Sequence, residues 1–335
     1  NILFLWPAGL LLRLVALKYF VDLDFFGGVH VLYIDLVWLI PFCCLSFILM
    51  IRKLPRVAVS LRIALALLVL PAFLGVYTQH IEPFRTEYPS HQIQMQAQAK
   101  PSHVEVKVAV LADIQTKKIS DYEREVVRRV VAQKPDIILL PGDLFQASYS
   151  GNFQLEREAL GQLLRSLSAP HGVYFVSGNC DNLARLEPLL AECGVRLLDG
   201  QIEQLVIRGQ KISLGGLGLA DFIAGRLTLV RRLSHQPSSH WKILLTHVPD
   251  VAMKLSADSA IDLIVAGHTH GGQIVVPLLG PPLTLSRLPR SIAAGGLSQH
   301  AHCQLFISRG VGCERSQAPR MRFLCPPEAP LLLLH

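Results

Sequence analysis

An almost uncharged apolar segment, residues 31–51, constrains the fold of this chain more than any other feature of its sequence. It reads VLYIDLVWLIPFCCLSFILMI and carries a single charge, on Asp35. A helix of this length spans the roughly 30 Å hydrocarbon core of a bilayer. Across the chain 51% of residues are hydrophobic and 17% are charged, which is too apolar for an ordinary soluble domain. The sequence therefore predicts a transmembrane helix here.

Two further apolar segments lie on either side of this one. Residues 63–79 have no charged side chain, and residues 2–20 have only Arg13 and Lys18. We predict a membrane region over residues 1–80 with two to three transmembrane helices. The alternative for the first segment is a cleaved signal peptide.

The charges between these segments predict their orientation. Arg52, Lys53, Arg56 and Arg62 lie between the second and third segments, whereas residues 21–30 contain acidic residues and no Lys or Arg. Short basic loops stay in the cytoplasm. We therefore predict a multi-pass membrane protein whose C-terminal part lies outside the cytoplasm.

Charge and cysteine content argue against two other classes of protein. The net charge is +7, but the 32 Lys and Arg residues are scattered, with no basic run of five or more, so we expect no nucleic-acid partner. The seven cysteines form no CxxC pair, although Cys43 and Cys44 are adjacent. They fit neither a disulfide framework nor a zinc finger.

The composition changes after the membrane region. Residues 81–103 are polar and contain several prolines, which predicts a linker. Over residues 104–335, short β-rich runs alternate with helical stretches, which predicts an α/β domain. Ser120 and Glu123 form a capping-box pattern at the start of its first helix. The expected strands are residues 104–112, 136–140, 172–177, 211–217, 242–246, 261–266 and 303–308, and the expected helices are residues 121–134, 154–167 and 182–193.

Polar side chains with metal-binding or catalytic chemistry follow five of these strands. Because open α/β sheets place their chemistry at the carboxyl ends of their strands, we expect these side chains to meet. A purely structural role for all of them would require independent accidents at five strand ends. The residues are Asp113 and Gln115, Asp143 after Gly142, Asn179 with Cys180 and Asp181, His247, and His268 with His270.

This set of donors fits a pair of divalent cations. Two cations about 3.5–4 Å apart need a bridging carboxylate and further nitrogen or oxygen ligands on each side. We assign the bridge to Asp143, because Gly142 before it permits a sharp turn. Imidazole and carboxylate ligands together suit Mn, Fe or Zn.

The order of these residues resembles that of the calcineurin-like metallophosphoesterase superfamily, whose pattern is D-x-H, GD, GNH, H and GHxH. The resemblance covers residues 104–335, and the run GHTHGGQ at residues 267–273 is its most specific part. The runs SRGVG at residues 308–312 and PRMRF at residues 319–323 resemble the membrane-associated branch. The resemblance implies a β-sandwich flanked by helices (α/β/β/α) and hydrolysis of phosphoester bonds.

The resemblance also implies a ligand set and a nucleophile. One cation would be held by Asp113, Gln115, Asp143 and His270, and the other by Asp143, Asn179, His247 and His268. Asp143, Asn179 and His247 would be the catalytic residues. The nucleophile would be a hydroxide that bridges the two cations.

Two positions depart from the family pattern. Gln115 replaces a histidine, and its amide oxygen is a harder ligand that favours manganese or magnesium. Cys180 replaces the histidine thought to protonate the leaving oxygen. That loss matters least when the leaving group is itself a stable phosphate anion, so we predict pyrophosphate bonds or activated esters as substrates rather than simple alkyl phosphodiesters.

These observations leave several functions open. The leading one is a membrane-anchored phosphoesterase with two divalent cations, manganese favoured, that hydrolyses a phosphodiester or pyrophosphate bond, with a lipid-linked substrate as one candidate. A more specific alternative is a UDP-2,3-diacylglucosamine pyrophosphatase of lipid A synthesis, whose cytoplasmic substrate conflicts with the predicted orientation. The other alternative is a degenerate metal-binding module that hydrolyses nothing.

Some neighbouring residues have simpler interpretations. Asp181 is interpreted as the N-cap of the helix that follows it, Asp250 as a turn residue and Cys180 as a packing residue. Arg309 is interpreted as structural, with contact to a substrate phosphate as the alternative.

Overall fold

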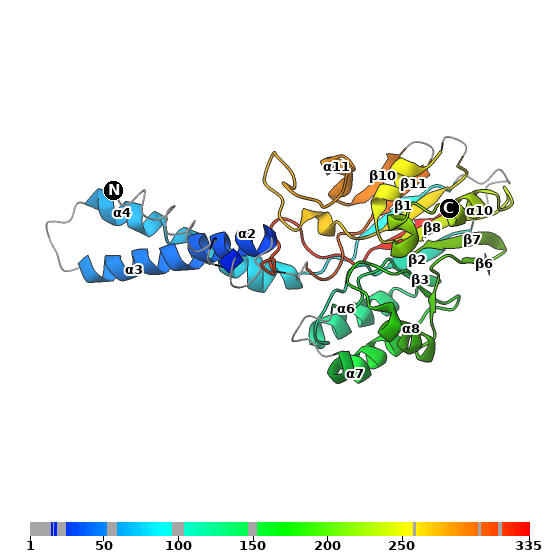
Figure 1. Ribbon diagram of the computed structural model, residues 1–335, viewed down its shortest axis with the longest axis horizontal. Coiled ribbons are helices and arrows are strands. Elements are labelled where there is room, and N and C mark those ends of the chain that lie inside the picture. The colour runs from blue at the N-terminus through cyan, green and yellow to red at the C-terminus, as the bar shows by residue number, and fades with distance from the viewer. Residues whose placement is uncertain are drawn as a thin grey trace. The chain divides into compact units, whose positions relative to one another are not determined.

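The computed structural model describes residues 15, 17–18, 25–51, 59–95, 104–146, 153–256, 259–300, 303–313 and 317–335 (Figure 1). The chain divides into two compact units. The helical unit comprises Asn1–Pro83 and Glu314–Arg322, and the sheet unit comprises Phe84–Cys313 and Phe323–His335.

The helical unit contains two long apolar helices. Phe25–Ile51 has 27 residues and Val59–Phe84 has 26, with mean hydropathies of 2.4 and 2.3 over their most apolar stretches. Only 22% and 6% of those stretches are buried, so most of their apolar side chains face outward. By length and composition both helices could cross a membrane, and a signal sequence near the N-terminus would have the same properties.

The predicted transmembrane segments 31–51 and 63–79 fall within these two helices. Segment 2–20, apart from residues 15, 17 and 18, and residues 52–58 of the basic loop lie outside the described residues. Both helices include a π-helical turn. Their parts are α2 (Phe25–Ile34), η1 (Asp35–Leu39), α3 (Ile40–Ile51), α4 (Val59–Leu67), α5 (Leu70–Val76), η2 (Tyr77–Ile81) and η3 (Glu82–Phe84).

Two mixed sheets of six strands form the sheet unit, and they confirm the predicted α/β fold. The first sheet has the order β1 (Ser90–Ile93), β12 (Leu331–Leu334), β2 (Val106–Val110), β3 (Ile137–Leu140), β4 (Val173–Phe175) and β5 (Val195–Leu197). The second has the order β10 (Gly296–His300), β11 (Cys303–Ile307), β9 (Leu263–Ala266), β8 (Trp241–Thr246), β7 (Gln210–Leu217) and β6 (Ile202–Ile207). Strands β2 to β5 run parallel, as do β11, β9, β8 and β7.

Helices cover the outer face of each sheet, and side chains such as Val108 and Ile243 form an apolar layer between the two sheets. The first sheet packs on three helices through residues such as Ile138, Val126 and Leu160. These helices are α6 (Asp121–Ala132), α7 (Phe153–Ser166) and α8 (Leu183–Glu192). The second sheet is covered by α10 (Thr228–Ser234) and η4 (Pro249–Lys254). The remaining short helices are α9 (Leu219–Ile223), η5 (His270–Gly272) and α11 (Arg290–Ala293).

Helix α6 shows how the local sequence sets an element. The Ser120 hydroxyl accepts a hydrogen bond from the backbone N–H of Tyr122, and the Glu123 carboxylate accepts one from the backbone N–H of Ser120. This is the predicted capping box, and it satisfies N–H groups that have no partner within the helix. Val126 and Val130 on one face of the helix are buried against the first sheet.

Several strands lie outside the predicted set, and β1 is the one that falls in the predicted linker. Residues 81–103, predicted as a linker, contain strand β1, which pairs in parallel with β12 so that Ser90 lies opposite Leu331. Of the four residues of β1 only Ile93 is buried. A mostly polar strand at a sheet edge has no apolar alternation to reveal it, so pairing with a distant segment determines its structure.

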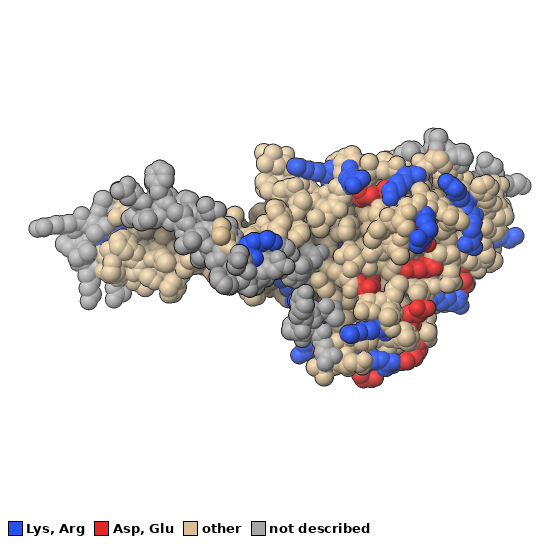
Figure 2. All heavy atoms as spheres, in the orientation of Figure 1, with Lys and Arg blue, Asp and Glu red and all other residues tan. Residues whose placement is uncertain are grey.

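Charged side chains of both signs are interspersed over the sheet unit on the face shown in Figure 2. Ion pairs of the sheet unit include Glu125 with Arg128 and Arg129 at 2.7 Å and Asp221 with Arg226 at 2.8 Å. This distribution agrees with the scattered Lys and Arg residues of the sequence.

Candidate metal centre

Two buried aspartates lie in neighbouring loops at the carboxyl ends of β2 and β3. Asp113 and Asp143 are 0% and 1% exposed. The backbone N–H of Asp113 donates to the carbonyl of Gly142 at 3.2 Å, and that of Gln115 donates to the carbonyl of Asp143 at 2.8 Å. These bonds hold the two loops together beyond the end of the parallel strand pair. Two adjacent buried carboxylates are costly unless a proton or a cation neutralises them.

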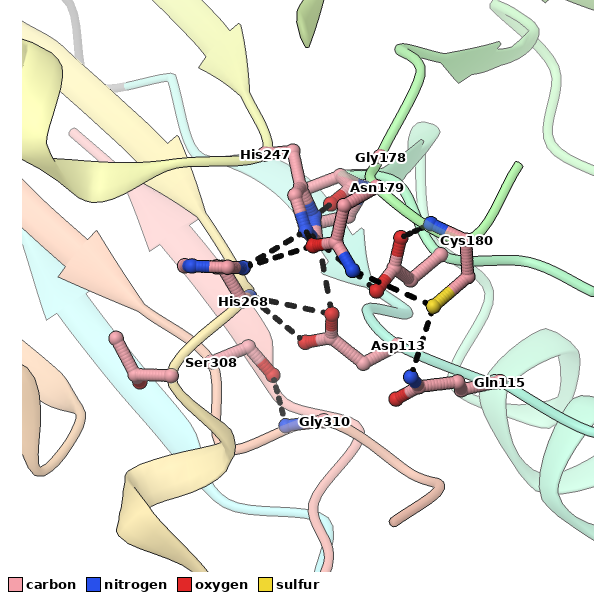
Figure 3. Close-up of polar contacts among 12 residues, drawn as sticks. Asp113, Gln115, Gly178, Asn179, Cys180, His247, His268, Ser308 and Gly310 are labelled. Atoms are coloured by element: carbon pink, nitrogen blue, oxygen red, sulfur yellow. Dashed lines mark hydrogen bonds and ion pairs between the residues drawn. The ribbon is translucent and has the colours of Figure 1, made fainter. Parts of the chain in front are cut away.

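Asn179, His247 and His268 meet beside these aspartates (Figure 3). His247 Nε2 lies 2.9 Å from Asn179 Oδ1. His268 Nδ1 lies 3.0 Å from the same oxygen and 3.1 Å from His247 Nε2. The three residues follow β4, β8 and β9, so both sheets contribute to one cluster of ligand atoms.

Hydrogen bonds around this cluster determine which atoms carry lone pairs. His247 Nδ1 lies 2.9 Å from the carbonyl oxygen of Pro141, which can only accept, so Nδ1 carries a proton, and in the neutral ring Nε2 carries the lone pair. The Asn179 amide donates from Nδ2 to Cys180 Sγ at 3.4 Å, which leaves Oδ1 facing His247. Two acceptor atoms therefore face each other. Adjacent ligands of an octahedral cation, each about 2.1 Å from it, lie about 3 Å apart, which matches this spacing.

The aspartates and the histidines share one site. One ligand atom from each of Asp113, Asp143 and His247 lies within 4.8 Å of the others. His247 Nε2 is 3.6 Å from Asp143 Oδ2, and the backbone N–H of His268 donates to both carboxylate oxygens of Asp113 at 3.1 Å. The structure thus brings together five of the seven predicted ligands, namely Asp113, Asp143, Asn179, His247 and His268.

The other two predicted ligands, Gln115 and His270, are also buried. Gln115 connects to the cluster through the carbonyl of Asp143 and through Cys180, to whose sulfur its Nε2 donates at 3.0 Å. His270 begins η5, two residues after His268, and its carbonyl accepts a hydrogen bond from the Cys325 thiol at 3.4 Å.

Burial keeps His268 in the form that a metal ligand requires. Burial, the largest cause, lowers the pKa of His268 to about 4. The ring is therefore neutral at pH 7, and a neutral imidazole has a lone pair to give to a cation.

The backbone is strained at the predicted ligands. Non-glycine residues rarely adopt positive φ, and each instance costs on the order of 1–3 kcal/mol. Such strain persists where the surrounding structure enforces it, which is common at functional sites. Five predicted ligands have positive φ: Asp113 (48°), Gln115 (39°), Asp143 (53°), His268 (72°) and His270 (49°).

Asp181 has a role that the sequence did not reveal. Its carboxylate accepts hydrogen bonds from the backbone N–H groups of Asp143, Leu144 and Gly178, each at 2.8 Å. It therefore ties the loop after β3 to the loop after β4. Burial and the charge of Asp143 raise the pKa of Asp181 to about 7. The interpretation of Asp181 as a helix N-cap is wrong, because the N-cap residue of α8 is Asn182.

Two other residues make structural contacts. The Arg309 guanidinium pairs with the buried carboxylate of Glu328 at 2.7 Å, as expected for a structural residue. The Asp250 carboxylate accepts hydrogen bonds from the Ser286 hydroxyl and the backbone N–H of Arg287, both at 2.7 Å. Asp250 therefore connects η4 to a later loop.

Comparison with known proteins places this site in a family. Residues 106–272, which contain every predicted ligand, match the profile of the calcineurin-like phosphoesterases. The chain is 28% identical over 269 residues to the uncharacterized metallophosphoesterase YkuE of Bacillus subtilis, covering 77% of this chain and 88% of that protein. It is also 28% identical over 269 residues to the phosphodiesterase YaeI of Escherichia coli, covering 77% and 92%. An uncharacterized metallophosphoesterase of Aquifex aeolicus is 29% identical over 271 residues, covering 78% and 96%. The chain therefore belongs to the calcineurin-like metallophosphoesterase superfamily, whose members are hydrolases of phosphoester bonds.

Proposed function

We propose that this chain is a membrane-anchored phosphoesterase that uses two divalent cations to cleave a phosphodiester or pyrophosphate bond. The observation that carries the proposal is the convergence of Asn179 Oδ1, His247 Nε2 and His268 Nδ1 at 2.9–3.1 Å. Asn179 Oδ1 and His247 Nε2 both bear lone pairs, and these would repel each other unless a cation or a proton lay between them.

The residues present fit two cations. Asp143, Asn179, His247 and His268 would hold one, and Asp113, Gln115, Asp143 and His270 would hold the other. When bound, the cations would neutralise charge on the phosphoryl oxygens and lower the pKa of a water molecule. The amide and carboxylate oxygens of the second set favour a hard cation, so manganese is the favoured metal.

The chain orients these ligands through contacts of its own. The Pro141 carbonyl fixes the ring of His247, and the backbone N–H of Cys180 donates to Asp143 Oδ1 at 2.8 Å. The other oxygen of Asp143, Oδ2, is the one nearer to His247. Ligand atoms held in place before the cations bind need little reorganisation, which favours catalysis by preorganised charge.

The residue after Asn179 supports a particular class of leaving group. Cys180 Sγ accepts hydrogen bonds from Gln115 Nε2 and Asn179 Nδ2, and it replaces the histidine that would protonate the leaving oxygen in the family pattern. A leaving group that is already a stable anion needs no such acid. We therefore favour pyrophosphates and activated phosphodiesters, and the name of the Escherichia coli relative, a phosphodiesterase, supports the second of these.

The two outward-facing apolar helices support anchoring in a membrane. Anchoring would hold the site near a bilayer surface, which makes a lipid-linked phosphoester a reasonable substrate. The predicted extracytoplasmic side is tested by protease accessibility of the sheet unit in intact cells and spheroplasts. Protection in spheroplasts would place it in the cytoplasm and favour the UDP-2,3-diacylglucosamine pyrophosphatase alternative.

Hydrolysis by the purified full chain tests the proposal. In mild detergent with Mn²⁺, we expect turnover of bis-p-nitrophenyl phosphate and of a nucleoside-diphosphate sugar, and much slower turnover of a dialkyl phosphate. Asp143→Ala should abolish both activities, whereas Asp221→Asn, a change in an ion pair on α9, should retain them. Stoichiometric binding of Mn²⁺ without turnover of any ester would instead indicate the non-hydrolytic module.

A further inference from the structure

A groove of about 540 Å³ opens beside the metal centre, within the sheet unit. Its walls come from α9, η4 and the loop before α11, and they include Phe222, Ile223, Met253 and Leu285. His268, whose Nδ1 belongs to the cluster of ligand atoms, lines the same groove. The volume lies in the range of small-molecule sites. The groove is thus continuous with the candidate active site.

Apolar side chains of this groove are exposed to solvent. Ile223 is 72% exposed, Met253 52% and Leu285 43%. A single exposed apolar side chain is ordinary, but several that line one concave surface indicate a binding site. They come from three separate segments of the chain, so local sequence alone does not bring them together.

Hydrogen bonds hold these walls in position. The Asp250 carboxylate on η4 binds the Ser286 hydroxyl and the Arg287 backbone, which fixes the segment next to Leu285. Lys254 Nζ lies 4.1 Å from the centre of the Phe222 ring and donates to the Phe222 carbonyl at 3.4 Å, which connects η4 to α9. The groove is therefore preformed, and a ligand would not have to order its walls.

The groove also contains charged side chains. Lys254 and Arg287 line it, and so does Asp250, whose carboxylate already accepts hydrogen bonds from Ser286 and Arg287, so the net charge of the lining is positive. A ligand that joins an apolar chain to an anionic group complements both features, whereas a purely polar ligand would leave the apolar side chains in water.

We propose that this groove binds the apolar chain of an amphiphilic phosphoester while its phosphate lies at the metal centre beside His268. The proposal rests on the proposed function, because it assumes that the centre binds a phosphoester. It adds that the substrate carries an alkyl or acyl chain next to the scissile phosphate and that Ile223 and Met253 contact this chain.

A homologous series of substrates tests the groove. The full chain in mild detergent with Mn²⁺ would be assayed on methyl, butyl and hexyl p-nitrophenyl phosphate diesters. Burial of each methylene group should raise kcat/KM about two- to fourfold, so the hexyl ester should exceed the methyl ester by at least about 30-fold. Equal rates for the three esters would overturn the proposal.

Variants distinguish binding in the groove from partition of the esters into detergent micelles, because that partition is the same for every variant. Ile223→Ser combined with Met253→Ser should lower the hexyl-to-methyl ratio of kcat/KM about tenfold. The matched control is Leu155→Ser, which changes a leucine that is 79% exposed on α7, and it should keep the native ratio. A native ratio in the double variant would contradict the assignment of these residues.

The proposed function and this inference can fail separately. If no ester is hydrolysed, the proposed function fails, and binding of hexyl and methyl phosphate to the manganese-loaded chain is then measured by calorimetry. Tighter binding of hexyl phosphate that the double variant loses would still support the groove. Equal affinities for the two phosphates would overturn it.

Discussion

The side-chain amide of Gln115 donates a hydrogen bond to the sulfur of Cys180 at 3.0 Å (Figure 3). These are the two positions at which the chain departs from the calcineurin-like pattern, and they are 65 residues apart in sequence. Because Nε2 donates to the sulfur, the buried Oε1 is the atom with which Gln115 would bind a cation. The two replacements therefore form one interacting pair.

In the proposed site for two cations, Cys180→Ala should weaken the binding of one Mn²⁺ ion about tenfold, because groups that orient a metal ligand contribute at least this much to affinity. Gln115→Ala removes the proposed ligand itself. The double variant should bind no more weakly than Gln115→Ala, since both changes act through the same bond. Calorimetric titration with Mn²⁺, together with the paramagnetic resonance signal of coupled Mn²⁺ ions, would measure both effects.

Cys180→Ser is the matched control for this pair, because its hydroxyl still accepts a hydrogen bond from Gln115 Nε2. It should bind Mn²⁺ within a fewfold of the native affinity. Strictly additive losses in the double variant would show that Cys180 does not act through Gln115.

Metal removal should lower the thermal stability of the sheet unit, because Asp113 and Asp143 are both buried and adjacent. A cation present at 100 times its Kd adds about 2.7 kcal/mol to the free energy of unfolding. We expect EDTA to lower Tm and Mn²⁺ to restore it. Asp143→Asn should lose most of this response and, in EDTA, unfold at a higher temperature than the native chain. A native Tm that responds to neither reagent would exclude a structural contribution of the metal.

The clustering of Asp113, Asp143, Asn179, His247 and His268 could be predicted from the sequence because each follows a strand that has a recognisable apolar run. Asp113 and Asp143 follow β2 and β3. Because the carboxyl ends of parallel strands lie at the same edge of a sheet, the order of these residues in the chain was enough to predict that they are neighbours. The role of Asp181 could not be predicted, since it depends on backbone N–H groups of a different loop. The lone pair of His247 likewise depends on the Pro141 carbonyl, 106 residues away.

Strands β1 and β12, at one side of the first sheet, were also not predicted. Strand β1 is mostly polar, and β12 is a run of four leucines whose period fits a helix or a strand equally well. Their pairing near the two ends of the sheet unit is a long-range contact that local propensity does not encode.

Gly178→Ala should disrupt the centre. A Cβ at this position would lie 2.2 Å from Asp143 Oδ1 and 2.4 Å from the Asp143 backbone nitrogen. The backbone nitrogen cannot move independently of the loop, and Oδ1 is held by the backbone N–H of Cys180, so the carboxylate that we propose as the bridge would be displaced. A displacement of about 1 Å at a catalytic group can cost about 100-fold in rate, and overpacking costs about 1–3 kcal/mol of stability. Turnover of bis-p-nitrophenyl phosphate and thermal unfolding would measure the two effects.

Gly161→Ala on α7 is the control for this change. Its Cβ would meet only side-chain atoms, at 3.3 Å from Leu189 Cδ1, and alanine favours a helix. It should retain native turnover. If Gly178→Ala also retained native turnover, the close approach of the two loops would not matter for activity.

Asp262, just before β9, should make stability depend on pH. Burial raises the pKa of Asp262 to about 6, although the backbone N–H of Lys242 donates to its Oδ2 at 2.7 Å. An aspartate in an unfolded chain has a pKa near 3.9. Between about pH 4 and pH 6 the folded state therefore binds more protons than the unfolded state. The contribution of the protonated Asp262 carboxyl to stability is complete below about pH 4 and is lost as the pH rises through about 6.

Asp262→Asn should remove this loss, because the amide keeps an oxygen for the Lys242 N–H and has no charge to bury. We expect Tm to be unchanged at pH 4 and raised at pH 8, by a free energy on the order of 1–2 kcal/mol. Thermal unfolding of the full chain in detergent at both pH values would measure the difference. The control is Glu187→Gln, which changes an exposed carboxylate on α8. It should shift Tm by a similarly small amount at both pH values. An equal gain for Asp262→Asn at pH 4 and pH 8 would show that it arises from packing and not from ionisation.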